Sequence, residues 1–318
     1  MGPLPAQSRA RLSVGKIAVV LNASSGHGAA VKVAARLQEI FGAAGREADI
    51  ALARNGAELR SAVRKAVEAG CETLVAGGGD GTINTAASAV VGREITLGVL
   101  PLGTLNHFAK DLEIPLNLEE AAKIIVDGTW CRVDVGEVNG RFFLNNSSLG
   151  VYPAIVRLRE RYRATFRGKW IAAFWAALTV IRRNPFMAVK LHVEGKELIR
   201  RTPLLLVSNN EYRTTGIHAG TRESITRGRL ALYLLNAERR QGLLGLALKT
   251  ILEGAERVKE LDLFTVEQVA VETRRRRLQV ALDGEVMTLD SPLHYQSRTK
   301  ALKVFVPATT TACYPGAS

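Results

Sequence analysis

The sequence predicts two domains: an α/β domain built on a parallel sheet, followed by a mainly antiparallel β-sandwich domain. Up to about Asp134, strand-like apolar runs alternate with helical patterns, an order typical of a parallel sheet covered by helices. Beyond this residue, short apolar runs separated by turn residues favour a sandwich. The length of 318 residues also suits two cores better than one. We expect a flexible tail over 1–14, the α/β domain over 15–134 and the sandwich over 135–318, whose last segment can pack back on the first domain.

Each expected strand of the α/β domain is a short apolar run that ends in small or polar residues. The first starts at Lys16, is rich in β-branched residues and stops at Asn22, as a buried strand that feeds a loop would. The expected elements, in order, are strand 16–22, helix 29–45, strand 47–53, helix 56–70, strand 73–76, helix 83–92 and strand 95–103. Ligands of such sheets bind at the carboxyl ends of the strands.

The sandwich domain is expected to consist of short strands with two helical interruptions. The strand-like runs lie within 140–150, 185–195, 202–210, 228–237, 263–273, 277–287 and 301–307. Helical patterns interrupt them around 153–183 and 240–255.

The composition is basic, and no apolar stretch reaches the ~20 residues of a membrane-spanning helix. The net charge of +13 attracts nucleic acid, anionic headgroups and nucleotide phosphates alike, so charge alone does not choose among them. A basic proteome or simple solubility is the simpler explanation of the excess. Residues 1–14 carry no apolar core segment and predict no secretion signal. The cysteines at positions 71, 131 and 313 are odd in number and scattered, which favours a reducing compartment without disulfides. We expect a cytoplasmic protein.

The segment Gly-Gly-Gly-Asp-Gly-Thr over residues 77–82 carries the strongest chemical signal. Three glycines in a row cost conformational entropy, so a reason for them is needed directly after a buried strand. Without side chains, backbone N–H groups can converge on phosphate oxygens, and the following helix adds the positive end of its dipole. The alternative is a plain strand-to-helix turn. The segment is neither a Walker A motif nor a dinucleotide fingerprint.

Five motifs in order extend this signal over most of the chain. They are Asn22–Gly28, Gly77–Thr82 followed by Asn84, Pro101–Asn106, Asn145–Gly150 and Leu282–Glu285. Together they resemble the catalytic domain of diacylglycerol and sphingosine kinases, whereas NAD kinases and phosphofructokinases share only the GGDGT core. Two positions depart from the family pattern: Ala23 replaces a proline, and His107 stands where aspartate is commoner.

The resemblance implies a nucleotide domain and a β-sandwich domain with ATP in the cleft between them, and transfer of the γ-phosphate to a lipid hydroxyl. The implied nucleotide-binding residues are Asn22, Ser25, Gly26, Gly28, Gly77, Gly78, Gly79, Asp80, Gly81, Thr82, Asn84, Gly103, Thr104 and Asn106. Mg²⁺ is expected to arrive with ATP, where Asp80 reaches the metal–nucleotide centre. Related bacterial enzymes bind a structural magnesium through aspartates that Thr226–Ala231 lacks, so no metal is expected there.

The implied acid–base groups are Asp283 and Glu285, because a carboxylate near the attacking hydroxyl can accept its proton. From spacing alone, an ordinary Asp-Gly hairpin turn explains the same residues better. The resemblance reverses that ranking and leaves open which carboxylate is the base.

The expected partners are ATP, a lipid alcohol and an anionic membrane surface, with no nucleic acid, and a homodimer stays open. The stretch Arg157–Asn184 combines arginines with aromatic residues, as an interfacial helix does, although a helix packed on its own protein fits equally well. The run Arg274–Arg277 is more simply an exposed strand or turn than a lipid contact. Diacylglycerol is the leading acceptor. Sphingoid bases, polyprenols, other glycerolipids, NAD kinase activity and nucleotide binding without turnover are the alternatives.

Overall fold

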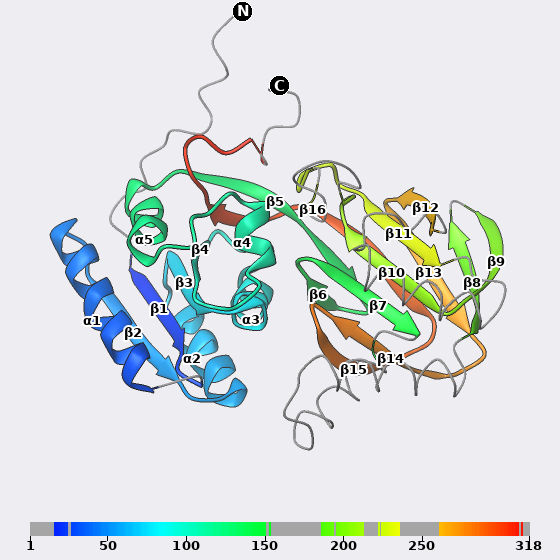
Figure 1. Cartoon of the computed structure of the whole chain (residues 1–318), viewed down its shortest axis with the longest axis horizontal. Helices are drawn as coiled ribbons and strands as arrows, with labels where there is room; N and C mark the ends of the chain where they lie inside the picture. The colour runs from blue at the N-terminus through cyan, green and yellow to red at the C-terminus, as the bar shows by residue number, and fades with distance from the viewer. Residues whose placement is uncertain are drawn as a thin grey trace, which may run out of the picture. The chain divides into compact units, whose positions relative to one another are not determined.

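The protein is described here from a computed structural model (Figure 1). The structure describes residues 16–24, 27–150, 153, 186–193, 195–212, 222, 224–235, 261–311 and 313. The chain forms two compact units: the first comprises residues 1–135, 224–227 and 299–318, and the second comprises 136–223 and 228–298. The expected tail 1–14 and the expected helices at 153–183 and 240–255 lie outside the described residues, apart from Pro153.

The first unit is built on a parallel sheet in the order β2-β1-β3-β4. The strands are β1 (Ile17–Asn22), β2 (Ala48–Ala53), β3 (Thr73–Gly78) and β4 (Thr96–Pro101). Every residue of β3 and β4 is buried, which is why these runs are almost continuously apolar. Beyond β4 the sheet continues with the end of β16 (Leu293–Phe305), where Val304 pairs in parallel with Leu97.

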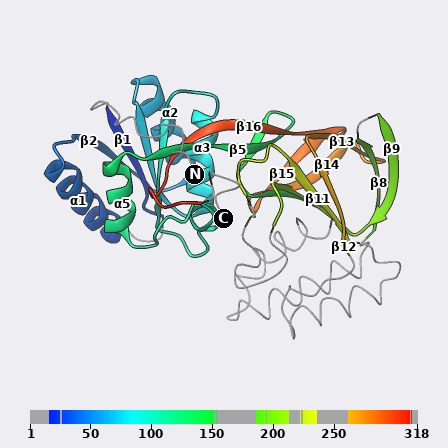
Figure 2. The same ribbon diagram turned by 90° about the horizontal axis from the view of Figure 1, so that it is seen from above.

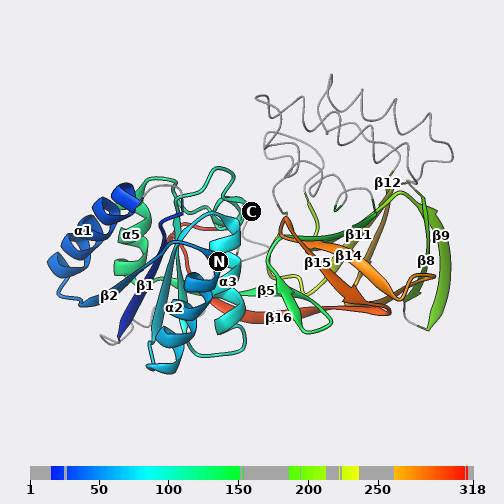
Figure 3. The same ribbon diagram turned by 90° about the horizontal axis from the view of Figure 1, so that it is seen from below.

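Helices cover both faces of this sheet. They are α1 (His27–Ala43), α2 (Gly56–Glu68), α3 (Asp80–Val90), α4 (His107–Asp111) and α5 (Leu118–Asp127). Helix α1 packs against α5, and α2 packs against α3, with the two pairs on opposite faces (Figures 2 and 3). The sequence analysis missed α4 and α5. The start of α5 is marked by Asn117, whose side chain accepts a hydrogen bond from the backbone N–H of Glu120 as an N-cap.

The second unit contains two packed antiparallel layers. One sheet has the order β12-β11-β10-β7-β14-β15. Its strands are β7 (Asn146–Gly150), β10 (Leu204–Asn209), β11 (Leu230–Leu235), β12 (Leu261–Val266), β14 (Arg277–Leu282) and β15 (Glu285–Asp290). The facing layer has the order β16-β13-β8-β9, with β5 and β6 beside β16. These further strands are β5 (Trp130–Val138), β6 (Arg141–Phe143), β8 (Met187–Val193), β9 (Lys196–Thr202) and β13 (Gln268–Thr273). The predicted fold class is confirmed.

Among the described residues, a buried hydroxyl pair lies in the apolar core between these layers. Phe143 and Tyr295 meet edge to face, with ring centroids 6.3 Å apart. The Tyr295 hydroxyl lies 2.8 Å from Ser147 Oγ, and both residues are buried. Burial raises the pKa of Tyr295 above its usual range, so the hydroxyl stays neutral and each polar group satisfies the other.

Removing one partner of this pair is expected to destabilise the protein. Tyr295→Phe leaves Ser147 Oγ buried without its partner, which should lower the free energy of unfolding by about 1–3 kcal/mol in urea titrations. The double variant Tyr295→Phe/Ser147→Ala should recover part of this loss, because neither partner then remains unpaired. Equal losses in the single and double variants would contradict this role.

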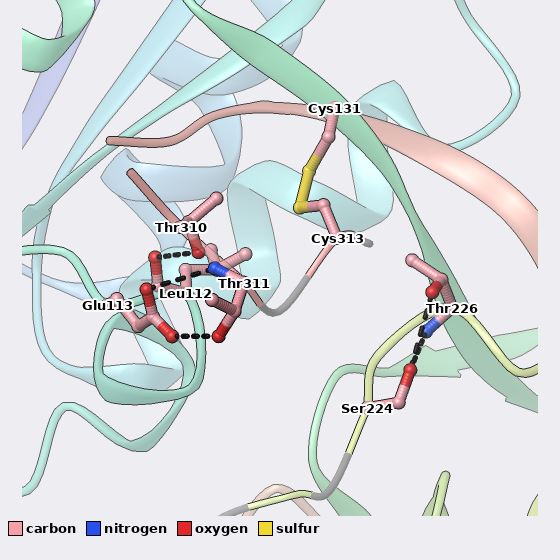
Figure 4. Close-up of a disulfide and its surroundings, with 8 residues drawn as sticks. All are labelled: Leu112, Glu113, Cys131, Ser224, Thr226, Thr310, Thr311 and Cys313. Carbon is pink, nitrogen blue, oxygen red and sulfur yellow. Dashed lines mark hydrogen bonds between the residues drawn. A yellow bond between two sulfur atoms is a disulfide. The ribbon is translucent and has the colours of Figure 1, made fainter. Parts of the chain in front are cut away.

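The cysteines differ from the sequence expectation. Cys131 of β5 and Cys313 form a disulfide, although 182 residues separate them (Figure 4), and Cys71 is buried and free. The expectation of no disulfide is wrong because the C-terminal segment returns to the first unit, which spacing cannot reveal. Thr311 Oγ1 also donates to Glu113 Oε1 at 2.9 Å in this segment. Within the part of the chain that is described, no helix has the length and apolar character needed to cross a membrane.

Candidate active site

Three strands of the first unit end in one row at the same edge of the sheet. The register pairs Leu21 with Gly77 and Gly78 with Pro101, so the ends of β1, β3 and β4 lie side by side. The three predicted nucleotide segments of this unit start from these ends. Ligands of open parallel sheets bind at this edge.

The predicted phosphate loop is tighter than the sequence suggested. Gly77 and Gly78 belong to β3, and α3 starts at Asp80, three residues before the expected helix. Gly79 alone separates strand from helix and is the N-cap, and it has no side chain to cap the first N–H groups of α3. These N–H groups and the positive end of the helix dipole can therefore bind a phosphate.

The glycines of this site serve two different needs. A Cβ on Gly77 would clash with Leu21, and one on Gly78 would clash with Thr82. A Cβ on Gly103 would meet the Cα of Gly79. These three positions are explained by packing within the protein. A Cβ on Gly79 would lie 3.6 Å from Gly103 Cα, an ordinary contact, so the protein itself leaves room for a methyl group there.

Side-chain hydrogen bonds connect the loops at this edge. Asn22 Nδ2 donates to Thr82 Oγ1 at 3.0 Å, which joins the end of β1 to the first turn of α3. Asp80 Oδ1 accepts from the backbone N–H of Phe108 at 3.4 Å, which joins α3 to α4. The structure thus brings together predicted residues from separate motifs.

Asn106 organises its own loop. It is buried and adopts a left-handed backbone conformation with φ 51°. Its Oδ1 accepts the backbone N–H of Gly103, and its Nδ2 donates to the backbone carbonyl of Gly103. Left-handed backbone is tolerated by asparagine better than by most residues, which accounts for the residue type. Thr104 and Leu105 are exposed between these two anchored residues.

The remaining predicted nucleotide residues lie around this edge. Gly28 lies in the first turn of α1, Gly81 and Asn84 lie in the first turns of α3, and Asn84 Oδ1 accepts from Ser88 Oγ at 3.1 Å. Ser25 and Gly26 lie outside the described residues.

In the second unit, the predicted acid–base residues occupy a β-hairpin. Leu282 pairs with Glu285, so Asp283 and Gly284 form a two-residue turn between β14 and β15. Both have positive φ, 47° and 88°, as a type I′ turn requires. The hairpin interpretation is therefore correct as a description of the backbone.

The Asp283 carboxylate does more than a turn requires. Its Oδ2 accepts the backbone N–H of Leu144 at 2.7 Å, and its Oδ1 accepts those of Asn145 and Asn146 at 2.8 and 2.9 Å. Burial raises the pKa of Asp283, while these three N–H groups and the positive charge of Arg222 act in the opposite direction. The carboxylate fixes the hairpin against the segment that leads into β7.

Glu285 has a different environment. It is exposed at the first position of β15. Within the described ranges, its carboxylate is engaged in no hydrogen bond or ion pair. The two carboxylates of this motif therefore differ in geometry: three backbone N–H groups hold Asp283, whereas Glu285 is exposed.

Arg222 is a residue of this site that the sequence analysis missed. It is buried, and its Nη1 donates to the carbonyls of Leu144 at 2.6 Å and Asn209 at 3.2 Å. Leu144 thus receives a hydrogen bond from Arg222 at its carbonyl and gives one to Asp283 from its N–H. No spacing signal in the sequence marks an arginine that donates to backbone carbonyls.

We expect Arg222 to act as a positioning residue. Arg222→Met should lower the free energy of unfolding by about 2–4 kcal/mol in urea titrations, because two buried carbonyls lose a charged donor. It should also change kcat by a larger factor than it changes the KM for ATP, with kcat falling, because the hairpin that carries Glu285 loses its support. Arg222→Lys should recover part of both losses. A variant that unfolds more easily but keeps wild-type kcat would show a purely structural role.

The segment Thr226–Ala231 contains no aspartate. Its first residue, Thr226, forms a local turn with Ser224. Thr226 N donates to Ser224 Oγ at 3.3 Å (Figure 4). Throughout the described segments, His, Cys, Asp and Glu side chains form no group of three or more that could hold a metal ion.

Two family models match consecutive regions of this chain. Residues 16–138 match the family described as the diacylglycerol kinase catalytic domain, and residues 148–306 match the YegS C-terminal NAD kinase beta sandwich-like domain. A Pseudomonas savastanoi pv. phaseolicola relative named "Probable lipid kinase YegS-like" is 30% identical over 83% of this chain and 85% of its own length. The chain belongs to the diacylglycerol kinase catalytic domain family. The predicted family is confirmed.

Other members of this lipid kinase family are also similar. A "Diacylglycerol kinase" of Mycobacterium tuberculosis is 28% identical over 93% of this chain and 97% of its own. A YegS-like relative from Pseudomonas aeruginosa is 41% identical, but the match spans only 42% of this chain and 44% of that relative. A solved Bacillus anthracis diacylglycerol kinase structure has the same fold, with a TM-score of 0.66 at 16% identity over 93% of this chain and 99% of that one.

Proposed function

We propose that the protein is an ATP-dependent lipid kinase that transfers the γ-phosphate of ATP to the hydroxyl of diacylglycerol, giving phosphatidic acid. Family membership supports the reaction class, and the names of the Mycobacterium tuberculosis and Bacillus anthracis relatives favour diacylglycerol as the acceptor. Gly79 is the observation that supports ATP binding in this proposal. The protein leaves room for a methyl group there, so the glycine is best explained by a phosphate that approaches the backbone.

In this proposal the two units divide the chemistry. The edge that carries Gly79, Asp80 and Thr82 binds the phosphates of ATP, and Asp80 faces the Mg²⁺ that accompanies the nucleotide as part of the substrate. Glu285 accepts the proton of the acceptor hydroxyl as its oxygen attacks the γ-phosphorus. Asp283 holds the hairpin and does not take the proton, because both of its oxygens accept backbone N–H groups.

An acceptor panel tests the substrate class. Purified protein is incubated with γ-labelled ATP and Mg²⁺ together with diacylglycerol, a sphingoid base, a polyprenol, a monoacylglycerol or NAD, and each product is identified by mass. We expect label in phosphatidic acid at a rate at least about tenfold above any other acceptor. Label in NADP would favour the second candidate, an NAD kinase, which the description of the second matched region suggests. Nucleotide binding without label transfer to any acceptor would exclude a kinase.

A further inference from the structure

Six exposed arginines of the second unit lie near the end of β9 and at the connection from β13 to β14. Arg200 and Arg201 lie on β9, Arg274–Arg276 connect β13 to β14, and Arg277 is the first residue of β14. We call these six residues the arginine end. Only the run at 274–277 is visible in the sequence as a cluster.

The strand register brings the two groups together. Strand β8 lies between β13 and β9, and its Val189 pairs with Thr273 on one side and with Arg200 on the other. Arg274 follows Thr273 directly, and β13 and β9 are two strand spacings apart, about 10 Å. Strands β8 and β9 lie side by side at the far edge of this layer (Figures 1 and 3). Arginines that are more than 70 positions apart in the sequence therefore lie at the same end of neighbouring strands.

Acidic side chains offset the positive charges in the middle of strands β8, β9 and β13, and the arginine end stays positive. Glu197 pairs with Lys190 at 2.6 Å, and Glu272 lies 3.3 Å from His192. At the arginine end itself, Arg277 lies 3.7 Å from Asp290, a long contact between highly exposed groups that contributes little. In the described part of the chain, no ion pair joins the other five arginines to a carboxylate.

Apolar side chains accompany the charge. Ile199 on β9 is 68% exposed, and it lies on the same face of the strand as Arg201. The Arg201 guanidinium stacks over the ring of Phe186, 5.3 Å from its centroid. Guanidinium groups bind phosphate with paired N–H donors, while exposed aliphatic and aromatic groups favour the boundary between headgroups and acyl chains.

Protection of a sheet edge explains only part of this surface. Strand β9 is an edge strand, and charged residues on it discourage pairing with another chain. Strands β13 and β14 are interior strands of their sheets, so the four arginines at their connection protect no edge. A ligand surface accounts for both groups.

We propose that the arginine end docks the protein on an anionic bilayer surface. The choice of a bilayer over nucleic acid rests on the proposed function, because a diacylglycerol acceptor resides in a membrane, and on the exposed apolar groups beside the charge. Several arginines acting together attract a soluble protein to such a surface reversibly, and salt weakens this attraction. The surface thus brings the enzyme to the membrane that holds its acceptor.

Vesicle sedimentation of the full-length protein tests the proposal. The patch variant Arg200→Gln/Arg201→Gln/Arg274→Gln/Arg275→Gln is compared with wild type on vesicles of phosphatidylcholine with 30% phosphatidylglycerol, a composition chosen as about one anionic lipid in three. The matched control, Arg60→Gln/Arg64→Gln/Lys65→Gln/Arg93→Gln, removes the same charge from exposed positions of the first unit. Circular dichroism and thermal unfolding confirm that both variants are folded.

We expect the patch variant to bind anionic vesicles at least about 100-fold more weakly at 0.1 M salt, and the control variant to change binding by less than about fivefold. Wild-type binding to pure phosphatidylcholine should be weak. Equal losses in both variants, or no loss in the patch variant, would overturn the proposal. A patch variant that loses affinity for a DNA duplex but keeps vesicle binding would also overturn it, in favour of nucleic acid. Sedimentation needs no turnover, so failure of the proposed kinase activity would be recognised separately.

Discussion

Glu285→Gln is expected to lower kcat for lipid phosphorylation by about 10²- to 10⁴-fold, the usual contribution of a general base. The glutamine side chain is nearly the same size but cannot accept the proton of the acceptor hydroxyl. The KM for ATP should stay within about threefold, because the phosphates are bound by the first unit. Initial rates over a range of ATP and diacylglycerol concentrations measure both quantities.

Asp283→Asn is the matched comparison, because it alters the other carboxylate of the same hairpin. Asparagine offers one acceptor oxygen where the aspartate accepts three N–H groups, so we expect the free energy of unfolding to fall by about 2–4 kcal/mol. Glu285 is exposed, and its variant should stay within about 0.5 kcal/mol of wild type. The opposite pattern, a stable Asp283→Asn variant without activity and an active Glu285→Gln variant, would reverse the two roles.

Gly79→Ala is expected to weaken ATP binding by at least about 100-fold while leaving the fold intact. The methyl group makes only an ordinary contact inside the protein, but it would stand where a phosphate approaches the start of α3. Calorimetric titration with ATP and Mg²⁺ measures the affinity, and the Tm should change by less than about 3 °C.

Two further glycines serve as controls for this experiment. Gly78→Ala introduces a clash with Thr82 and should lower the Tm. A methyl group at Gly42 on α1 meets nothing within 4 Å, so Gly42→Ala should leave the Tm unchanged or slightly raised and the ATP affinity unchanged. Tight ATP binding by the Gly79→Ala variant would contradict the assignment of Gly79 to a phosphate-binding loop.

Local sequence patterns sufficed to predict most of the fold. The alternation of strands and helices before Asp134 corresponds to β1 to β4 with α1 to α3, because buried parallel strands and amphipathic helices have distinct periods. The Asp-Gly dipeptide likewise marked the hairpin between β14 and β15, since a type I′ turn needs two residues with positive φ. Both signals lie within a few neighbouring residues.

Features that depend on distant residues were not predictable. The disulfide joins Cys131 to Cys313 only because the chain returns to its first unit. Arg222 supports the hairpin through backbone carbonyls, which carry no sequence signal. Spacing also could not distinguish Asp283 from Glu285. Their difference comes from three N–H groups of residues 144–146, more than 130 positions earlier in the chain.

The most direct test is the transfer of label from γ-labelled ATP to diacylglycerol in mixed micelles. The rate is measured for wild type, Glu285→Gln and Gly79→Ala under identical conditions, and ATP affinity is measured in parallel. We predict that both variants label phosphatidic acid at least about 100-fold more slowly than wild type, with normal ATP affinity in Glu285→Gln and at least about 100-fold weaker ATP affinity in Gly79→Ala. Labelled phosphatidic acid at the wild-type rate with either variant would contradict the assigned site, and none with wild type would contradict the assigned reaction.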